Sequence, residues 1–153
     1  MQEILFVCMG NICRSPMAEA IFRDAFVKER QQADFLVDSA ATSSWEVGNP
    51  PHRGTQKILK QHNISTKGIV ARQIKLTDFD RFDYIIAMDN ENLSDLKEMA
   101  PADSKAEILL YLDILPEKQG QSIPDPWYTG DFEETYGLIT AGLKPWLSFF
   151  NQA

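Results

Sequence analysis

The chain has 153 residues, of which 44% are hydrophobic and 24% are charged, and its formal net charge is −7. These proportions are ordinary for a globular protein, and the length predicts one domain, residues 1–153, with its own core. The negative charge disfavours a general nucleic-acid binder, because such proteins neutralise phosphates with lysine and arginine. No apolar run approaches the ~20 residues that span a bilayer, and the first residues lack the basic start of a signal peptide. We therefore expect no membrane insertion and a cytoplasmic location.

Apolar runs alternate with amphipathic segments along the chain. Residues 3–9 are typical of a buried strand, and the helical spacing of apolar residues from Ala18 to Phe26 predicts a helix over 16–29. The last apolar face, from Phe132 to Phe150, predicts a long helix that Pro145 should kink or split. The same patterns predict strands at 34–40, 83–89 and 106–112, a helix at about 54–62, and a helix after residue 89 that Asp89 caps.

Strands that alternate with helices favour a parallel sheet. The sequence therefore predicts an α/β fold, a three-layer α/β/α sandwich with a four-stranded parallel sheet. Ligands of such sheets bind beyond the carboxyl ends of the strands, so the loops at 8–15, 40–53 and 113–130 are the candidates for a binding site.

The first of these loops joins a cysteine to the start of a helix. Both cysteines, Cys8 and Cys13, lie in it, and two are too few for a disulfide scaffold. Taken alone, Cys8 fits a small buried hydrophobic residue. Beside an arginine and a helix N-terminus, however, its thiol is expected to lose its proton readily and to be a nucleophile at neutral pH. Arg14 adds a planar fork that holds two oxygens of a phosphate.

The same loop has the backbone features of a phosphate-binding loop. Gly10 and Asn11 both tolerate positive φ, so residues 9–14 are expected to curl until their amides point at one anion. Ser15 is expected to cap the helix, with Pro16 at its first position. The positive end of that helix would strengthen the attraction for an anion.

The residues from Val7 to Pro16 resemble the V-C-x-G-N-x-C-R-S-P signature of the low-molecular-weight protein tyrosine phosphatases. The resemblance implies hydrolysis of phosphotyrosine through a cysteinyl-phosphate, with Cys8 as the nucleophile, Arg14 as the phosphate clamp and Asp125 as the general acid and base. It implies no metal and no cofactor, because the guanidinium and the loop amides supply the positive charge. The similarity extends along nearly the whole chain, through MAEAIF (17–22), VDSAATS (37–43), GNPP (48–51), ARQI (71–74), FDYIIAMD (82–89) and IPDPWY (123–128).

The resemblance also implies a set of substrate-binding residues. Trp45, Trp127 and Tyr128 would hold a flat phenyl ring between aromatic faces, although each alone is more often a packing residue. Relatives often have a histidine before the A-R-Q segment that contacts the loop asparagine. Residues 67–72 contain no histidine, so Ser39 is expected to support the asparagine together with Ser15. The implied substrate-binding set is Met9, Gly10, Asn11, Ile12, Cys13, Ser15, Trp45, Trp127 and Tyr128.

Four further residues have structural interpretations, and for some of them a functional role is also expected. Cys13 is close enough to Cys8 along the loop to trap its oxidised form as a reversible disulfide, and the alternative is a passive packing residue. His52 and His62 lie next to turn or helix-end residues and are predicted to be surface groups. Asp89 is predicted to be a helix cap with a supporting role at the site.

Two other functions remain open. One is a protein-arginine phosphatase on the same scaffold, in which the position of Ile12 tends to be threonine and the aromatic pair after Asp-Pro is reduced. The other is a non-catalytic phosphate-binding module, against which the presence of both Cys8 and Asp125 argues. An arsenate reductase of this fold would need cysteines after Cys13, and the sequence has none. The expected partners are phosphotyrosine-containing proteins and a cognate tyrosine kinase, and the chain is expected to be a monomer.

Overall fold

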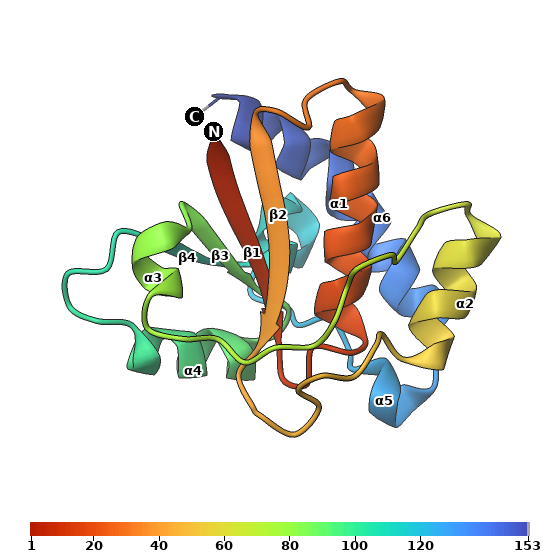
Figure 1. Ribbon diagram of the computed structural model, residues 1–153, viewed down its shortest axis with the longest axis horizontal. Helices are drawn as coiled ribbons and strands as arrows, with labels where there is room; N and C mark the ends of the chain where they lie inside the picture. The colour runs from red at the N-terminus through yellow and green to blue at the C-terminus, as the bar shows by residue number, and fades with distance from the viewer. Residues whose placement is uncertain (153) are drawn as a thin grey trace.

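The sheet at the centre of the molecule has four parallel strands, seen in a computed structural model that describes residues 1–152. The strand order is β2-β1-β3-β4 (Figure 1). These strands confirm the predicted α/β fold with an all-parallel sheet, and their ends differ from the predicted ones by a few residues. Their bounds are β1 (Gln2–Cys8), β2 (Phe35–Ala41), β3 (Tyr84–Ala87) and β4 (Glu107–Leu110).

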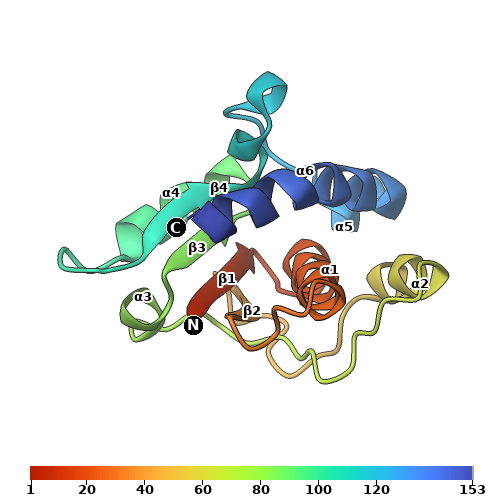
Figure 2. The same cartoon turned by 90° about the horizontal axis from the view of Figure 1, so that it is seen from above.

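Helices cover both faces of this sheet, as Figure 2 shows in the view from above. Buried side chains of α1, α2 and α6 form one hydrophobic cluster with β1, and buried side chains of α3 and α4 form another. No helix within residues 1–152 is long and apolar enough to cross a membrane. The helices are α1 (Arg14–Lys28), α2 (Arg53–Gln61), α3 (Asp78–Arg81), α4 (Asn90–Met99), α5 (Pro126–Thr129) and α6 (Phe132–Gln152).

The strand β1 is buried on both sides, which is typical of a strand inside a parallel sheet. Because side chains alternate along a strand, Ile4 and Phe6 enter the cluster with α1 and α6, whereas Leu5 and Val7 enter the cluster with α3 and α4. Cys8, the last residue of β1, lies on the α1 side and is only 3% exposed. Burial of β1 on both faces therefore fixes the position of Cys8, at the carboxyl edge of the sheet.

The last helix, α6, runs without a break from Phe132 to Gln152, with Pro145 inside it. Pro145 was predicted to kink or split this helix, and the helix is not split there. Proline removes one backbone hydrogen bond, but the residues that follow it anchor the helix in the core. Trp146 and Phe150 are buried, and the indole Nε1 of Trp146 donates to the carbonyl oxygen of Tyr111 at 3.1 Å.

The long connection between β4 and α6 is mostly structured. It contains the 3-10 turns η1 (Tyr111–Ile114) and η2 (Pro116–Lys118), followed by α5. In Figure 1, α5 lies at the same end of the molecule as the carboxyl end of β2. This connection therefore brings residues 123–128 to the edge of the sheet where β1 ends.

Candidate active site

The loop that was predicted to bind phosphate follows β1 and occupies residues 9–13. Asn11 has φ of 57°, in the left-handed region, whereas Gly10 does not have positive φ. Only one of the two residues expected to turn the loop in this way therefore does so. The turn directs the backbone N–H of Asn11 to the Sγ atom of Cys8, at 3.3 Å.

Ser15 contacts the sulfur and does not cap the helix, contrary to the prediction. Helix α1 begins at Arg14, and Cys13 holds the cap position without a side-chain hydrogen bond. Ser15 is therefore inside the first turn, and its Oγ lies 3.0 Å from the Sγ of Cys8. Because the Ser15 hydroxyl contacts the sulfur, no side chain caps the N-terminus of α1. The backbone amides of the first turn therefore remain available to bind an anion.

The side chain of Asn11 ties the loop to the rest of the fold. Its Nδ2 donates to the Oγ of Ser15 at 2.8 Å and to the Oγ of Ser39 at 2.9 Å. Its Oδ1 accepts the backbone N–H of Arg72 at 3.0 Å. Ser39 is thus placed where its expected supporting role requires it, and a backbone amide from the A-R-Q segment provides the third contact.

Arg14 lies beside the loop with a side chain that is only 2% exposed. Its Nη1 donates to Asp89 Oδ2 at 2.7 Å and to the carbonyl oxygen of Ile123 at 2.9 Å. Its Nη2 lies 3.4 Å from Asp125 Oδ2. Its Nε is buried and has no hydrogen-bond partner within residues 1–152. A buried donor of this kind calls for an acceptor, and a bound oxyanion would provide one.

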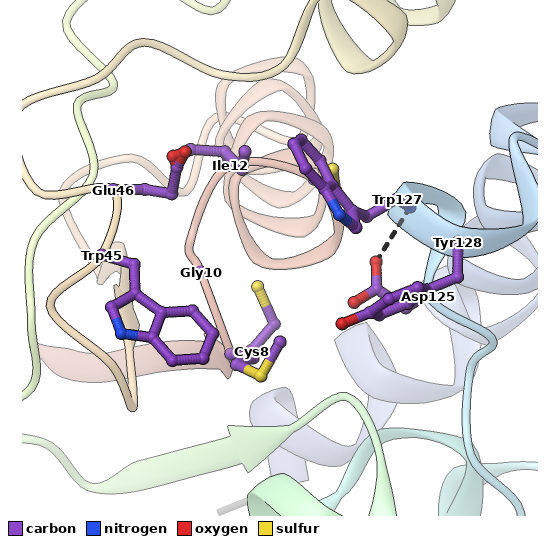
Figure 3. A pocket seen from close by; sticks show the side chains of 10 residues that line it. Cys8, Gly10, Ile12, Trp45, Glu46, Asp125, Trp127 and Tyr128 are labelled. Carbon is purple, nitrogen blue, oxygen red and sulfur yellow. Dashed lines mark hydrogen bonds between the residues drawn. The ribbon is translucent and has the colours of Figure 1, made fainter.

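The two aspartates around Arg14 are both held by helix capping. Asp89 caps α4, as predicted, because its Oδ1 accepts the N–H of Asn92 at 2.7 Å. Asp125 caps α5, because its Oδ1 accepts the N–H of Trp127 at 3.0 Å (Figure 3). In each case the second oxygen faces Arg14. The caps therefore orient two carboxylates toward one guanidinium.

A pocket of about 150 Å³ opens above the sulfur. Figure 3 shows Trp45 on one side of Cys8 and Trp127 and Tyr128 on the other. These aromatic side chains are 77%, 57% and 73% exposed, respectively. Glu46 also lines the pocket and was missed, because nothing in the sequence separates it from other surface glutamates. The lining residues are Cys8, Met9, Gly10, Ile12, Cys13, Trp45, Glu46, Asp125, Trp127 and Tyr128.

His52 supports the pocket wall and is not the simple surface group that was predicted. It is half-buried, and its Nδ1 accepts the N–H of Gly54 at the start of α2. Its ring stacks on Phe132 at 5.0 Å and meets Trp127 edge-on at 5.7 Å. His62, in contrast, is exposed, as predicted, with its ring stacked on that of Tyr136.

Cys13 is buried and free, as is Cys8. Burial raises the pKa of the Cys13 thiol to about 12, and the nearby Cys8 and Asp125 add to this rise. At neutral pH Cys13 therefore carries its proton. Within residues 1–152, no group of three or more histidine, cysteine, aspartate or glutamate side chains is arranged to hold a metal ion.

Comparison with known proteins decides the family. The model of the low molecular weight phosphotyrosine protein phosphatases matches residues 3–153. The chain belongs to this family. Membership makes it a phosphomonoester hydrolase, consistent with a cysteine and an arginine on one anion-binding loop.

Individual members of the family align with almost the full chain. The low molecular weight protein-tyrosine-phosphatase YfkJ from Bacillus subtilis is 49% identical over 148 residues, which cover 97% of this chain and 95% of that protein. Its crystal structure superposes with a TM-score of 0.95 over 99% of this chain and 96% of that one, at 47% identity. PtpA from Staphylococcus aureus is 44% identical over 91% of this chain and 87% of its own length. The crystal structure of the Drosophila arginine phosphatase DARP is also similar, with 40% identity, a TM-score of 0.90 and 98% of each chain covered.

Proposed function

We propose that this phosphatase hydrolyses phosphotyrosine in proteins by a double displacement at Cys8. The thiolate attacks phosphorus in line, and the bond to the tyrosine oxygen breaks while Asp125 gives that oxygen its proton. Asp125 then takes a proton from water, whose oxygen attacks the cysteinyl-phosphate. Inorganic phosphate leaves, and the Cys8 thiolate is restored.

The observation that carries this proposal is the environment of one sulfur atom. Cys8 Sγ lies at the N-terminal end of α1, in contact with the N–H of Asn11 and the hydroxyl of Ser15. Donors of this kind favour the anionic form of a thiol. Arg14 lies beside them with a buried Nε free to bind a phosphate oxygen. The same charges that favour the thiolate would therefore hold the phosphoryl group, which passes through a transition state with charge on its equatorial oxygens.

The walls of the pocket favour an aromatic phosphate ester. Trp45 and Trp127 present exposed indole rings on opposite sides of the opening, and Tyr128 extends one of these sides. Aromatic rings gain about 0.5–1.5 kcal/mol from stacking or edge-on contact beyond the burial of their area. Among the phosphate esters of serine, threonine and tyrosine, phosphotyrosine is the one that offers such a ring.

The second candidate is a protein-arginine phosphatase, because the similar structure of DARP is described as an arginine phosphatase. Three side chains of the pocket favour tyrosine over arginine: Ile12, Trp127 and Tyr128 all line it. A pocket with an apolar side chain in its lining and an aromatic pair at the rim suits a phenyl ring better than a guanidinium. A purely phosphate-binding module is disfavoured, since Cys8 and Asp125 line the same pocket.

Two assays test the proposal. Hydrolysis of p-nitrophenyl phosphate in a chelator should be retained by the native chain and abolished in Cys8→Ser, whereas activity in Cys8→Ser would contradict the nucleophile. A panel of phosphotyrosine and phosphoarginine peptides matched in sequence then distinguishes the two enzymes. We expect the higher kcat/KM for phosphotyrosine, and the reverse order would favour the arginine phosphatase.

We also propose that Cys13 protects the nucleophile by a reversible disulfide. A peroxide would oxidise Cys8 to a sulfenic acid, and the Cys13 sulfur would then attack it and release water. The charge of Cys8 contributes to the high pKa of Cys13, and oxidation removes that charge, so the change favours the attack. Dithiothreitol should restore activity after peroxide treatment in the native chain but not in Cys13→Ala. Equal recovery of both would contradict this role.

The setting of the reaction is part of the same proposal. We expect residues 1–153 to act as one domain and as a monomer, on phosphotyrosine proteins of the cytoplasm that a tyrosine kinase phosphorylates.

A further inference from the structure

A buried glutamate in α1 ends the hydrogen-bond chain that starts at the nucleophile. Glu19 is only 7% exposed, whereas Arg23, one turn further along α1, is half-buried and Lys28 is exposed. Its Oε1 accepts the hydroxyl of Ser39 at 2.6 Å. No step of the phosphatase reaction needs this carboxyl. Removing a carboxyl group from water costs free energy, so its burial calls for an explanation.

The hydrogens along this chain can be assigned one by one. Ser39 has a single hydroxyl hydrogen, which it gives to Glu19, so its oxygen is free to accept from Asn11. Asn11 Nδ2 has two hydrogens and gives the second to the oxygen of Ser15. The hydroxyl hydrogen of Ser15 is then left for the sulfur of Cys8, 3.0 Å away.

The amide of Asn11 is fixed in the orientation that this order requires. Its Oδ1 accepts the backbone N–H of Arg72. If the amide turned over, two N–H donors would face each other there, and an oxygen would face each serine. The two serine hydroxyls would then donate to Asn11, and neither Glu19 nor Cys8 would receive a hydrogen. The Arg72 N–H and the Glu19 carboxyl therefore favour the same orientation of the amide, in which each serine accepts from Asn11 and donates away from it.

We propose that Glu19 is a positioning residue for the phosphatase reaction. Its buried oxygen orients Ser39 and Asn11 so that Ser15 donates to the Cys8 sulfur, which must leave as an anion when the cysteinyl-phosphate is hydrolysed. The same bonds hold Asn11 in its left-handed conformation, which costs energy for a residue with a side chain. This inference rests on the proposed role of Cys8 as nucleophile.

The role of Glu19 does not depend on its charge. Burial raises the pKa of its carboxyl to about 7, and the nearby Asp38 adds to the rise, whereas the hydroxyl of Ser39 and the cations Arg23 and Arg72 oppose it. Both forms are present at neutral pH. A carboxylate and the carbonyl oxygen of a neutral carboxyl both accept a hydrogen bond, so the direction of the chain is kept through the titration.

Three variants separate positioning from packing and from ion pairing. Glu19→Met keeps the length and loses the acceptor, Glu19→Gln keeps an acceptor oxygen, and Arg23→Gln removes the ion pair that Arg23 makes with Glu19 at 3.9 Å. We expect Glu19→Met to lose about tenfold in kcat per folded molecule, the order expected when a buried hydrogen-bond partner is lost. KM for p-nitrophenyl phosphate should change little, and alkylation of Cys8 by iodoacetate at a fixed pH should be slower. Glu19→Gln should recover most of the kcat, and Arg23→Gln should match the native chain.

A double-mutant cycle adds a second criterion. Adding Glu19→Met to Ser39→Ala should cause no further loss of kcat, because the carboxyl acts through that hydroxyl. Native kcat and native alkylation in Glu19→Met would overturn the inference, and so would equal losses in the Met and Gln variants. If Cys8→Ser is inactive while Glu19→Met is unaffected, this inference fails alone, and activity in Cys8→Ser would refute the proposed function itself.

A measurement on the unaltered chain keeps the test independent of folding. A neutron crystal structure should place the Ser39 deuterium on the line to Glu19 Oε1 and the Ser15 deuterium on the line to Cys8 Sγ. A Ser39 deuterium directed at Asn11 would contradict the proposed direction.

Discussion

The stability of the Glu19→Gln variant relative to the native chain should increase as the pH rises. Burial raises the pKa of Glu19 in the folded protein from its ordinary value of 4.5 to about 7. Between these two values the unfolded chain has released its proton and the folded protein still holds it. Folding must therefore take up a proton, and the free energy of unfolding falls as pH rises through this window.

The size of the effect follows from the two pKa values. A change from 4.5 to about 7 corresponds to about 3 kcal/mol of stability, present below pH 4.5 and lost above pH 7. Glutamine does not titrate, so Glu19→Gln lacks this loss. The difference in unfolding free energy, variant minus native, should rise by about 3 kcal/mol from pH 4.5 to pH 7.5.

Urea denaturation at a series of pH values measures this difference. Fluorescence is a suitable probe, because Trp146 is 2% exposed and will report the loss of the core. The exposed Glu117 provides a matched control, and Glu117→Gln should run parallel to the native chain across the same range. A constant difference between Glu19→Gln and the native chain would refute the reasoning, since it would mean that Glu19 titrates alike in both states.

Three further predictions follow from the site and its supports. Asp89→Asn keeps a capping oxygen for α4 but loses the charged partner of Arg14, so kcat should fall at least tenfold while thermal unfolding shows a loss of about 1–3 kcal/mol. Trp127→Ala should raise KM for p-nitrophenyl phosphate several-fold with little change in stability, because this side chain is 57% exposed, and steady-state kinetics will show it. Gly54→Ala should destabilise the fold by about 1–3 kcal/mol in urea, because a Cβ there would lie 2.5 Å from the ring of Phe132.

The architecture was predictable because periodicity and loop chemistry agree. The buried run before Cys8 and the amphipathic segments around it require a parallel sheet covered on both faces, which the structure has. Pro145 was the exception. It was expected to kink or split the helix, but α6 continues through it as one helix packed against the core, and the sequence does not display that packing.

Site residues were predictable where the residue type and its position suggest one role, and they were missed or misassigned where a commoner structural role also fits. Cys8 and Arg14 were predicted to lie together on one loop before a helix, and the structure places them there. Ser15 looked like a helix cap because serine commonly is one, and only three-dimensional proximity shows that its hydroxyl faces the sulfur. Glu19 was invisible in the sequence, because one glutamate on an amphipathic helix looks like any solvated side chain. His52 was misread for a related reason, since its stacking partner Phe132 is far away along the chain.

The covalent intermediate is the most direct test of the central claim. Asp125→Ala removes the proposed base for the attacking water, so a phosphorylated enzyme should accumulate when p-nitrophenyl phosphate is added and the mixture is denatured within seconds. Fragmentation of the peptide of residues 1–14 by mass spectrometry should place one phosphoryl group on Cys8 and none on Cys13. A phosphoryl group on any other side chain, or rapid turnover without any covalent species, would contradict the account.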